Sequence, residues 1–158
     1  MKKYLKLASA ALAIIGVIMM FFTQVTATWN HPPYHVESLG IQALVGGDSK
    51  YGVSFTGVSS GLAGYILLGV AAVILLVVAL VPYFKEHDML SAVVTGLAVV
   101  CAIVGVILIF LIRKNFAENN GPFKECIVGW AMIAGGSLGS LSALAGGVSI
   151  IFDVNGSN

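Results

Sequence analysis

The chain has 158 residues, of which 58% are hydrophobic and 9% charged, and its formal net charge is +1 at pH 7. Soluble domains carry about a quarter charged residues, so these few charges could not cover the surface of a domain in water. The near-neutral balance also argues against a nucleic-acid partner, because phosphate binding needs clustered Lys and Arg.

Four long stretches of the chain contain no charged residue. A helix of about 20 residues crosses the ~30 Å hydrocarbon core of a membrane, and each stretch is long enough. The sequence therefore predicts an all-α membrane protein, a four-transmembrane-helix bundle in the cell membrane with lipid around it. The uncharged stretches are Leu7–Asn30, Tyr51–Phe84, Met89–Ile112 and Cys126–Phe152. In one domain, 1–158, the predicted helices cover about 7–28, 58–82, 89–112 and 126–152, and an outer loop covers about 29–57.

The first predicted helix follows a basic amino terminus, so a cleaved signal peptide is the competing interpretation. Lys2, Lys3 and Lys6 precede the apolar run Leu7–Phe22, and Val25-Thr26-Ala27 resembles a small-residue cleavage site. The apolar run exceeds the ~7–15 residues that are usual in a signal peptide. This length favours a helix that stays in the membrane.

The outer loop begins where Pro32 and Pro33 prevent the helix from continuing. Within it, Ile41–Val45 and Tyr51–Phe55 have the composition of short strands, and the turn Gly46–Ser49 lies between them. The loop is therefore expected to form a small β-hairpin on the membrane surface.

The second and third helices are joined by the short polar turn Lys85–Asp88, which follows Pro82. So short a connection predicts that the two helices form an antiparallel hairpin. Arg113 and Lys114 end the third helix.

The orientation in the membrane rests on the distribution of basic residues, which are normally more frequent on the cytoplasmic side. With four spans, each side carries four of them, so the count is a tie. The three lysines before the first helix break the tie, because that helix usually dominates. Both termini are then cytoplasmic and the outer loop is extracytoplasmic.

The fourth helix is unusually rich in small residues. Of the 25 residues Ile127–Ile151, 14 are Gly, Ala or Ser. Small residues let membrane helices approach closely. Close packing matters in lipid because the hydrophobic effect does not drive helices together there. The pattern predicts a helix-packing or partner interface, or a pore lining, and contact with this chain's own helices is the alternative. The predicted interface residues are Gly135, Gly136, Gly139, Ser140, Ala143 and Gly147.

Candidate chemistry is sparse, because every charged residue lies outside the predicted spans. Cys101 and Cys126 form no CxxC pair and are expected to be buried thiols. His31, His35 and Glu37 could in principle ligate a metal, but the prolines after His31 disrupt the helical spacing that would bring both imidazoles together. We therefore predict no catalytic residues, no metal site and no cofactor.

A short inner amino terminus, a longer first outer loop with strands, a tight inner turn, a smaller second outer loop and a short tail together resemble the claudin and peripheral-myelin-protein group. The resemblance covers the whole chain as a layout. The W…GLW…C…C signature of that family is absent, since Trp29 stands alone and the loop has no cysteine. The resemblance implies lateral self-assembly and partner contact rather than catalysis, and it assigns no site residue.

The predicted function is accordingly that of a non-enzymatic multi-pass membrane protein, a structural or accessory subunit acting by helix–helix and outer-loop contacts. Its expected partner is a second copy, giving a homo-oligomer, or another membrane subunit. The alternative is a small channel or transporter subunit in which the Gly/Ser-rich fourth helix lines the pathway.

Overall fold

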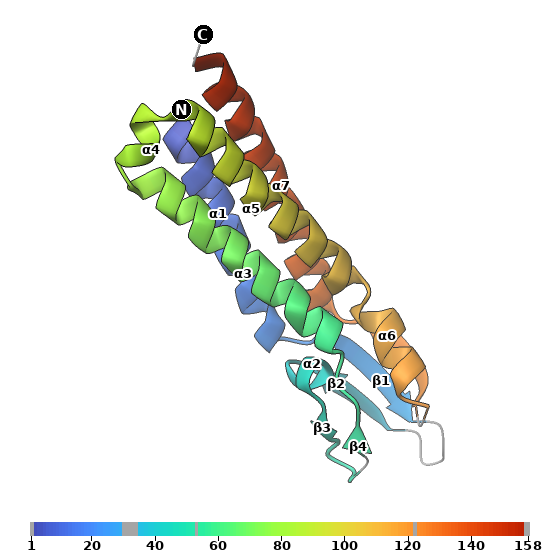
Figure 1. Ribbon diagram of the computed structural model, residues 1–158. Coiled ribbons are helices and arrows are strands. Elements are labelled where there is room, and N and C mark those ends of the chain that lie inside the picture. The colour runs from blue at the N-terminus through green and yellow to red at the C-terminus, as the bar shows by residue number, and fades with distance from the viewer. Residues whose placement is uncertain (1, 30–34, 53, 122, 157–158) are drawn as a thin grey trace.

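The computed structural model describes residues 2–29, 35–52, 54–121 and 123–156. It is mostly helical, with four long helices side by side and small sheets at one end of them (Figure 1). The elements are α1 Lys2–Ile18, the 3-10 turn η1 Met19–Phe21, β1 Val25–Trp29, β2 Val36–Leu39, α2 Gln42–Val45, β3 Gly47–Asp48, β4 Ser54–Phe55, α3 Ser59–Leu80, α4 Tyr83–Glu86, α5 Asp88–Phe110, α6 Ile112–Asn119, β5 Phe123–Val128 and α7 Trp130–Gly156.

The prediction of four long apolar helices is confirmed. By length and composition, α1 with η1, α3, α5 and α7 are each able to cross a membrane. They pack in a ring, so that α1 and α5 each contact both α3 and α7. Both termini and α4 lie at one end of the bundle, and the sheets lie at the other (Figure 1).

The boundaries of two helices differ from the prediction. The first helix, expected over 7–28, ends by Phe21, and Val25–Trp29 is a strand instead. Gln24 helps to end the helix, because its side-chain amide donates hydrogen bonds to the carbonyls of Met19 and Phe22. The fourth helix, expected over 126–152, begins only at Trp130 and continues to Gly156.

The segments that replace the end of the first predicted helix and the start of the fourth are strands, β1 and β5, and they pair with each other. β1 is the central strand of an antiparallel sheet of order β2-β1-β5, and Ala27 lies opposite both Glu37 and Cys126. Gly129, directly after β5, has no room for a side chain against the carbonyl of Thr23. The sheet therefore ties the first outer loop to the segment before α7.

The hairpin in the outer loop is shorter than predicted, and one of its two predicted strands is helical. Gln42–Val45 is the helix α2 rather than a strand, because this places Ala43 and Leu44 in the core. Gly46 ends α2 with a φ of 84°, a conformation that favours glycine. A shorter hairpin does form, in which β3 pairs with β4.

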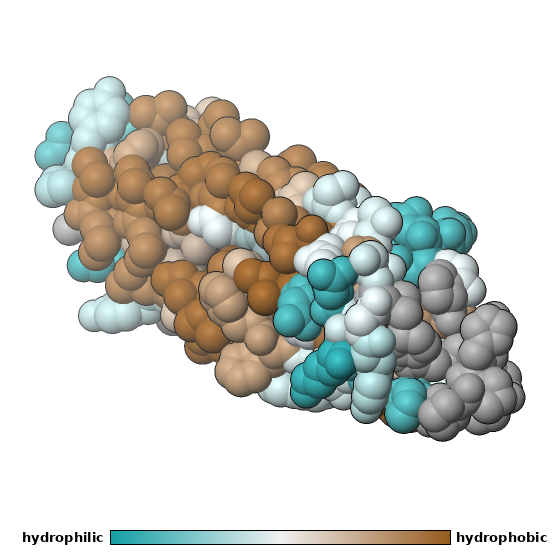
Figure 2. Space-filling view, turned by 90° about the horizontal axis from the view of Figure 1, so that it is seen from below, coloured by the Kyte–Doolittle hydropathy of each residue, from teal (hydrophilic) through white to brown (hydrophobic). Residues whose placement is uncertain are grey.

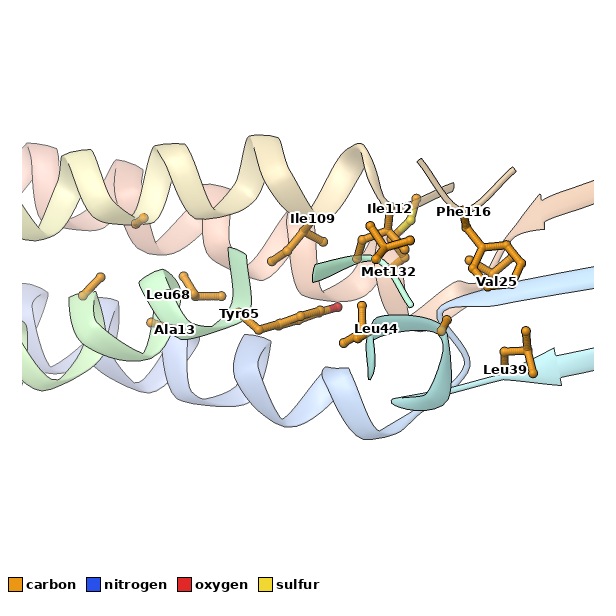
Figure 3. Packing of buried hydrophobic residues seen from close by; sticks show 14 of the residues in the cluster. Ala13, Val25, Leu39, Leu44, Tyr65, Leu68, Ile109, Ile112, Phe116 and Met132 are labelled. Carbon is orange, nitrogen blue, oxygen red and sulfur yellow. The ribbon is translucent and has the colours of Figure 1, made fainter. Parts of the chain in front are cut away.

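A continuous apolar core runs from the bundle into the sheet end (Figure 3). Leu68 and Ile109 belong to the bundle, while Leu44 from α2 and Phe116 from α6 extend the core beyond it. Phe55, Phe116 and Phe123 cluster there, with ring centroids 5.8–6.5 Å apart. The elements at the sheet end therefore share one apolar core with the helix bundle.

The outside of the bundle is also apolar. Figure 2 shows a brown hydrophobic surface over the helices, with teal polar residues at the two ends. We call this surface the apolar belt; Val93 is 69% exposed in it and Leu144 is 66% exposed. Other exposed members include Ile66, Val73, Leu97, Val100, Ile107 and Ile151.

Candidate functional site

The structure divides the six predicted interface residues of α7 into two groups, and the first group packs inside this chain. A Cβ atom on Gly135 would lie 2.9 Å from the Tyr65 hydroxyl. One on Gly139 would lie 2.6 Å from Val106 Cγ2, and one on Gly136 would meet the ring of Phe110. These glycines therefore let α7 pack closely against α3 and α5.

The second group, Ser140, Ala143 and Gly147, lines an open groove between α5 and α7. The groove has a volume of about 620 Å³ and its surface is almost entirely apolar. The Ser140 hydroxyl does not change this, because it donates to the carbonyl of Gly136 on its own helix. A Cβ on Gly147 would have no atom within 4 Å. The remaining lining residues of this α5–α7 groove are Val99, Ile103, Val106, Ile107, Leu144, Val148 and Ile151.

A buried ion pair, not predicted from the sequence, lies at the end of the bundle that holds the termini. Lys6 Nζ in α1 lies 2.6 Å from Asp153 Oδ2 in α7 and donates a 2.6 Å hydrogen bond to Ser91 Oγ in α5. Ser91 Oγ donates to the same Asp153 oxygen at 3.1 Å. Lys6 is only 4% exposed and Asp153 only 1%. Three helices are thereby joined by one charged cluster.

Helical spacing would have placed Lys6 on the buried face of α1. Ser9, Ala10 and Ala13 lie three, four and seven residues after it, which is the spacing of one helix face, and all three are fully buried. The Ser9 hydroxyl donates to the Ser142 carbonyl at 2.6 Å, and the Ser142 hydroxyl donates back to the Ser9 carbonyl at 2.8 Å. Polar groups therefore link α1 to α7 beyond the ion pair.

A small pocket lies over the charged cluster, between the end of α3 and the start of α5. We call it the terminal pocket; its volume is about 230 Å³. Asp153 lines it, and its Oδ1 atom is buried with no hydrogen-bond partner among the described residues. The lining residues are Lys3, Lys6, Val78, Ala79, Phe84, Asp88 and Asp153.

At the opposite end, polar side chains hold the turn after α1 and the sheet in place. The Tyr65 hydroxyl donates to Gln24 Oε1 at 2.8 Å, and Gln24 is fully buried. Arg113 Nε donates to the carbonyl of Cys126 at 2.7 Å. Burial raises the pKa of the Cys126 thiol, although the nearby charge of Arg113 acts to lower it. Cys126 thus stays a neutral thiol near pH 7.

The metal-ligand hypothesis for the outer loop concerns three residues. His31 lies outside the described residues. The ring of His35 stacks on Tyr51 with centroids 4.1 Å apart, and Glu37 Oε1 accepts a hydrogen bond from the Lys50 backbone amide. Over the described part of the chain, no three His, Cys, Asp or Glu residues are grouped as a metal site would need.

These sites offer contact surfaces and charged groups. The α5–α7 groove can hold an apolar group, and the terminal pocket can hold a small polar one. No protein-family model, no curated protein and no solved structure matches this chain.

Proposed function

We propose that this chain is a non-enzymatic multi-pass protein of the cell membrane, which acts as a structural or accessory subunit of a membrane assembly. The apolar belt supports the membrane environment, because a surface of this extent in water would drive aggregation. The claudin-like layout would imply the same kind of work, lateral self-assembly and partner contact.

The α5–α7 groove is the observation that carries the proposal. A transmembrane helix of a second copy, or of another membrane subunit, docks there against Ser140, Ala143 and Gly147. Because lipid tails are as apolar as the groove, the gain on docking comes from close backbone approach and dispersion contacts. The open space at Gly147 allows that approach.

The sheet end supplies the second contact surface of the proposal. β2 and β5 are the two outer strands of the sheet, and Val36 and Ile127 on them are more than half exposed. In the proposed orientation both termini are cytoplasmic, so this end faces outward and can meet a partner there.

A substitution at Gly147 tests the docking proposal. We expect Gly147→Leu to fill the groove and to convert the assembled protein to monomer in a mild detergent, with an unchanged thermal unfolding midpoint. The measurement is native mass spectrometry, supported by crosslinking in membranes. Co-purification of a different subunit with the wild type would identify the partner as that subunit.

Two further glycines provide the controls. Gly69 of α3 faces the α1–α3 side of the bundle, where a Cβ would be 3.8 Å from Val17, so Gly69→Leu should leave assembly intact. Gly139→Leu should instead lower the stability of the fold, because its side chain would collide with Val106. Assembly of Gly147→Leu equal to wild type, or a wild type that is monomeric in bilayers, would contradict the proposal.

The Lys6–Asp153 pair favours one second candidate, a small channel or transporter subunit. Charged pairs inside helix bundles often mark ion or substrate pathways. Ion or solute flux into liposomes that contain only the pure protein would support this candidate. Intact assembly without flux would leave the contact proposal in place.

A further inference from the structure

The terminal pocket lies where the membrane surface would cross the protein. Its walls come from both ends of the chain and from the middle of it: Lys3 and Lys6 of α1, Ala79 near the end of α3, and Asp153 near the end of α7. Phe84 in α4, the short connection between α3 and α5, also lines it. If the four helices span a bilayer, as proposed above, this is the level of the lipid head groups.

The charges that line the pocket are of both signs. Lys3 and Lys6 provide two positive charges, and Asp88 and Asp153 provide two negative ones. Lys6 uses two hydrogen bonds on Ser91 and Asp153, and an ammonium group has three donors, so one remains. A ligand that matches this lining carries both an anionic and a cationic group.

Asp153 indicates where the cationic group belongs. Its Oδ2 atom accepts from Lys6 and Ser91, whereas its Oδ1 atom is buried and has no partner in the described part of the structure. An unpartnered buried carboxylate oxygen is costly, and a donor N–H from a ligand would remove that cost. A bare metal cation fits less well, because two lysines share the pocket.

We propose that the terminal pocket binds a phosphoethanolamine head group, carried by a membrane phospholipid. The phosphate lies toward Lys3 and the free donor of Lys6, and the primary ammonium donates to Asp153 Oδ1 beside the charge of Asp88. A volume of about 230 Å³ suits a group of this size rather than a larger ligand. Val78, Ala79 and Phe84 face the start of the lipid's apolar part.

The test compares head groups on the intact protein. Protein purified in detergent is mixed with phosphatidylethanolamine, phosphatidylcholine or phosphatidylglycerol, and the retained lipid is measured by native mass spectrometry. Phosphatidylcholine has no ammonium N–H and phosphatidylglycerol has no cation, so we expect phosphatidylethanolamine to bind about tenfold more tightly than either. Equal retention of all three would overturn the proposal. Displacement of the lipid by an equal concentration of free phosphoethanolamine would overturn the assignment to a lipid.

Variants separate this site from general lipid contact. Lys3 is exposed, so Lys3→Gln should leave the fold intact. Because Lys3 contacts the phosphate that all three lipids share, the substitution should weaken the binding of phosphatidylethanolamine about tenfold and weaken the binding of the other two lipids as well. Lys114→Gln, an exposed lysine at the other end of the bundle, should change nothing. Asp153→Asn should remove the preference among the three head groups, but it also disturbs the ion pair, so Lys3→Gln is the variant that tests the site. Binding of phosphatidylethanolamine to Lys3→Gln as tight as to the wild type would contradict the site.

Failure of this inference and failure of the proposed function give different results. A chain that stays in bilayers and assembles, yet holds the three lipids equally, would remove only the phosphoethanolamine site. A chain that is monodisperse in buffer without detergent would remove the membrane proposal, on which this inference rests.

Discussion

The Lys6–Asp153 pair is almost entirely buried at the floor of the terminal pocket. Both side chains are at most 5% exposed, and Ser91 of α5 completes their hydrogen bonds on one side. Removing two charges from water costs several kcal/mol per ion, and the pair regains this only through good geometry. We therefore expect the pair to set the register of α1 against α7 more than it adds stability.

This account predicts an asymmetry between single and double substitutions. Asp153→Leu leaves Lys6 charged and buried, so we expect it to lower the free energy of unfolding by about 3–5 kcal/mol. Adding Lys6→Met replaces the pair by apolar side chains and should restore most of that loss. Unfolding curves in detergent for both single variants and the double variant measure the coupling. Additive losses would contradict a direct interaction.

At the same scale, this pair could not be predicted from the sequence. The predicted helices are bounded by charged residues, so Lys6 and Asp153 necessarily fall in the flanking segments. The burial of Lys6 depends on a partner 147 positions away in the chain, and a pattern of neighbouring residues cannot identify so distant a partner. Only the spacing of Lys6 with Ser9, Ala10 and Ala13 pointed to the buried face of α1.

Among the elements, α3 and α5 approach each other closely at Gly64 and Gly105. A Cβ on Gly64 would lie 2.8 Å from the Gly105 carbonyl oxygen, and one on Gly105 would lie 2.7 Å from the Gly64 carbonyl oxygen. The obstacle is backbone in both directions, so it cannot rotate away as a side chain would. Small residues at both positions are therefore needed for this helix contact.

A pair of alanine substitutions on α5 tests this point. Gly105→Ala should force α3 and α5 apart and lower the free energy of unfolding by about 1–3 kcal/mol, the usual cost of overpacking. Gly96→Ala, on the same helix but with no atom within 4 Å of the new Cβ, should be neutral or stabilise by up to about 1 kcal/mol. Thermal unfolding in detergent compares them, and equal losses would contradict the close approach.

The long helices could be predicted because a charge-free stretch of more than 20 residues has few alternatives, whereas the strands could not. Val25–Trp29 and Phe123–Val128 are apolar or mixed segments beside long helices, and a short apolar run does not distinguish a strand from a helix end. Their pairing joins Val25 to Val128, far apart in the chain. The β-branched residues of β1 were the local evidence for a strand.

At the scale of the whole molecule, the two ends of the bundle carry different elements. One end holds the termini, α4 and the terminal pocket, and the other holds the sheet, α6 and the β3–β4 hairpin (Figure 1). The apolar belt separates them (Figure 2). If the bundle spans a membrane as proposed, this arrangement exposes the two ends of the molecule on opposite sides of that membrane.

Two matched glutamates measure that exposure. Glu86 is exposed in α4 at the end with the termini, and Glu118 is exposed in α6 at the sheet end. Each is changed to Cys in a background where Cys101 and Cys126 are Ala. The loss of Glu118 from its exposed pair with Lys114 should cost little, because surface ion pairs are worth ~0–1 kcal/mol.

With cytoplasmic termini, a membrane-impermeant maleimide should label Glu118→Cys in intact cells and Glu86→Cys only after permeabilisation. The opposite pattern would keep the four spans and reverse the orientation. The two sides carry equal numbers of basic residues, so the basic-residue count alone favours neither orientation. Labelling of both positions in intact cells is the result that the arrangement cannot accommodate. Both ends of an antiparallel four-helix bundle that spans a bilayer cannot face the same compartment.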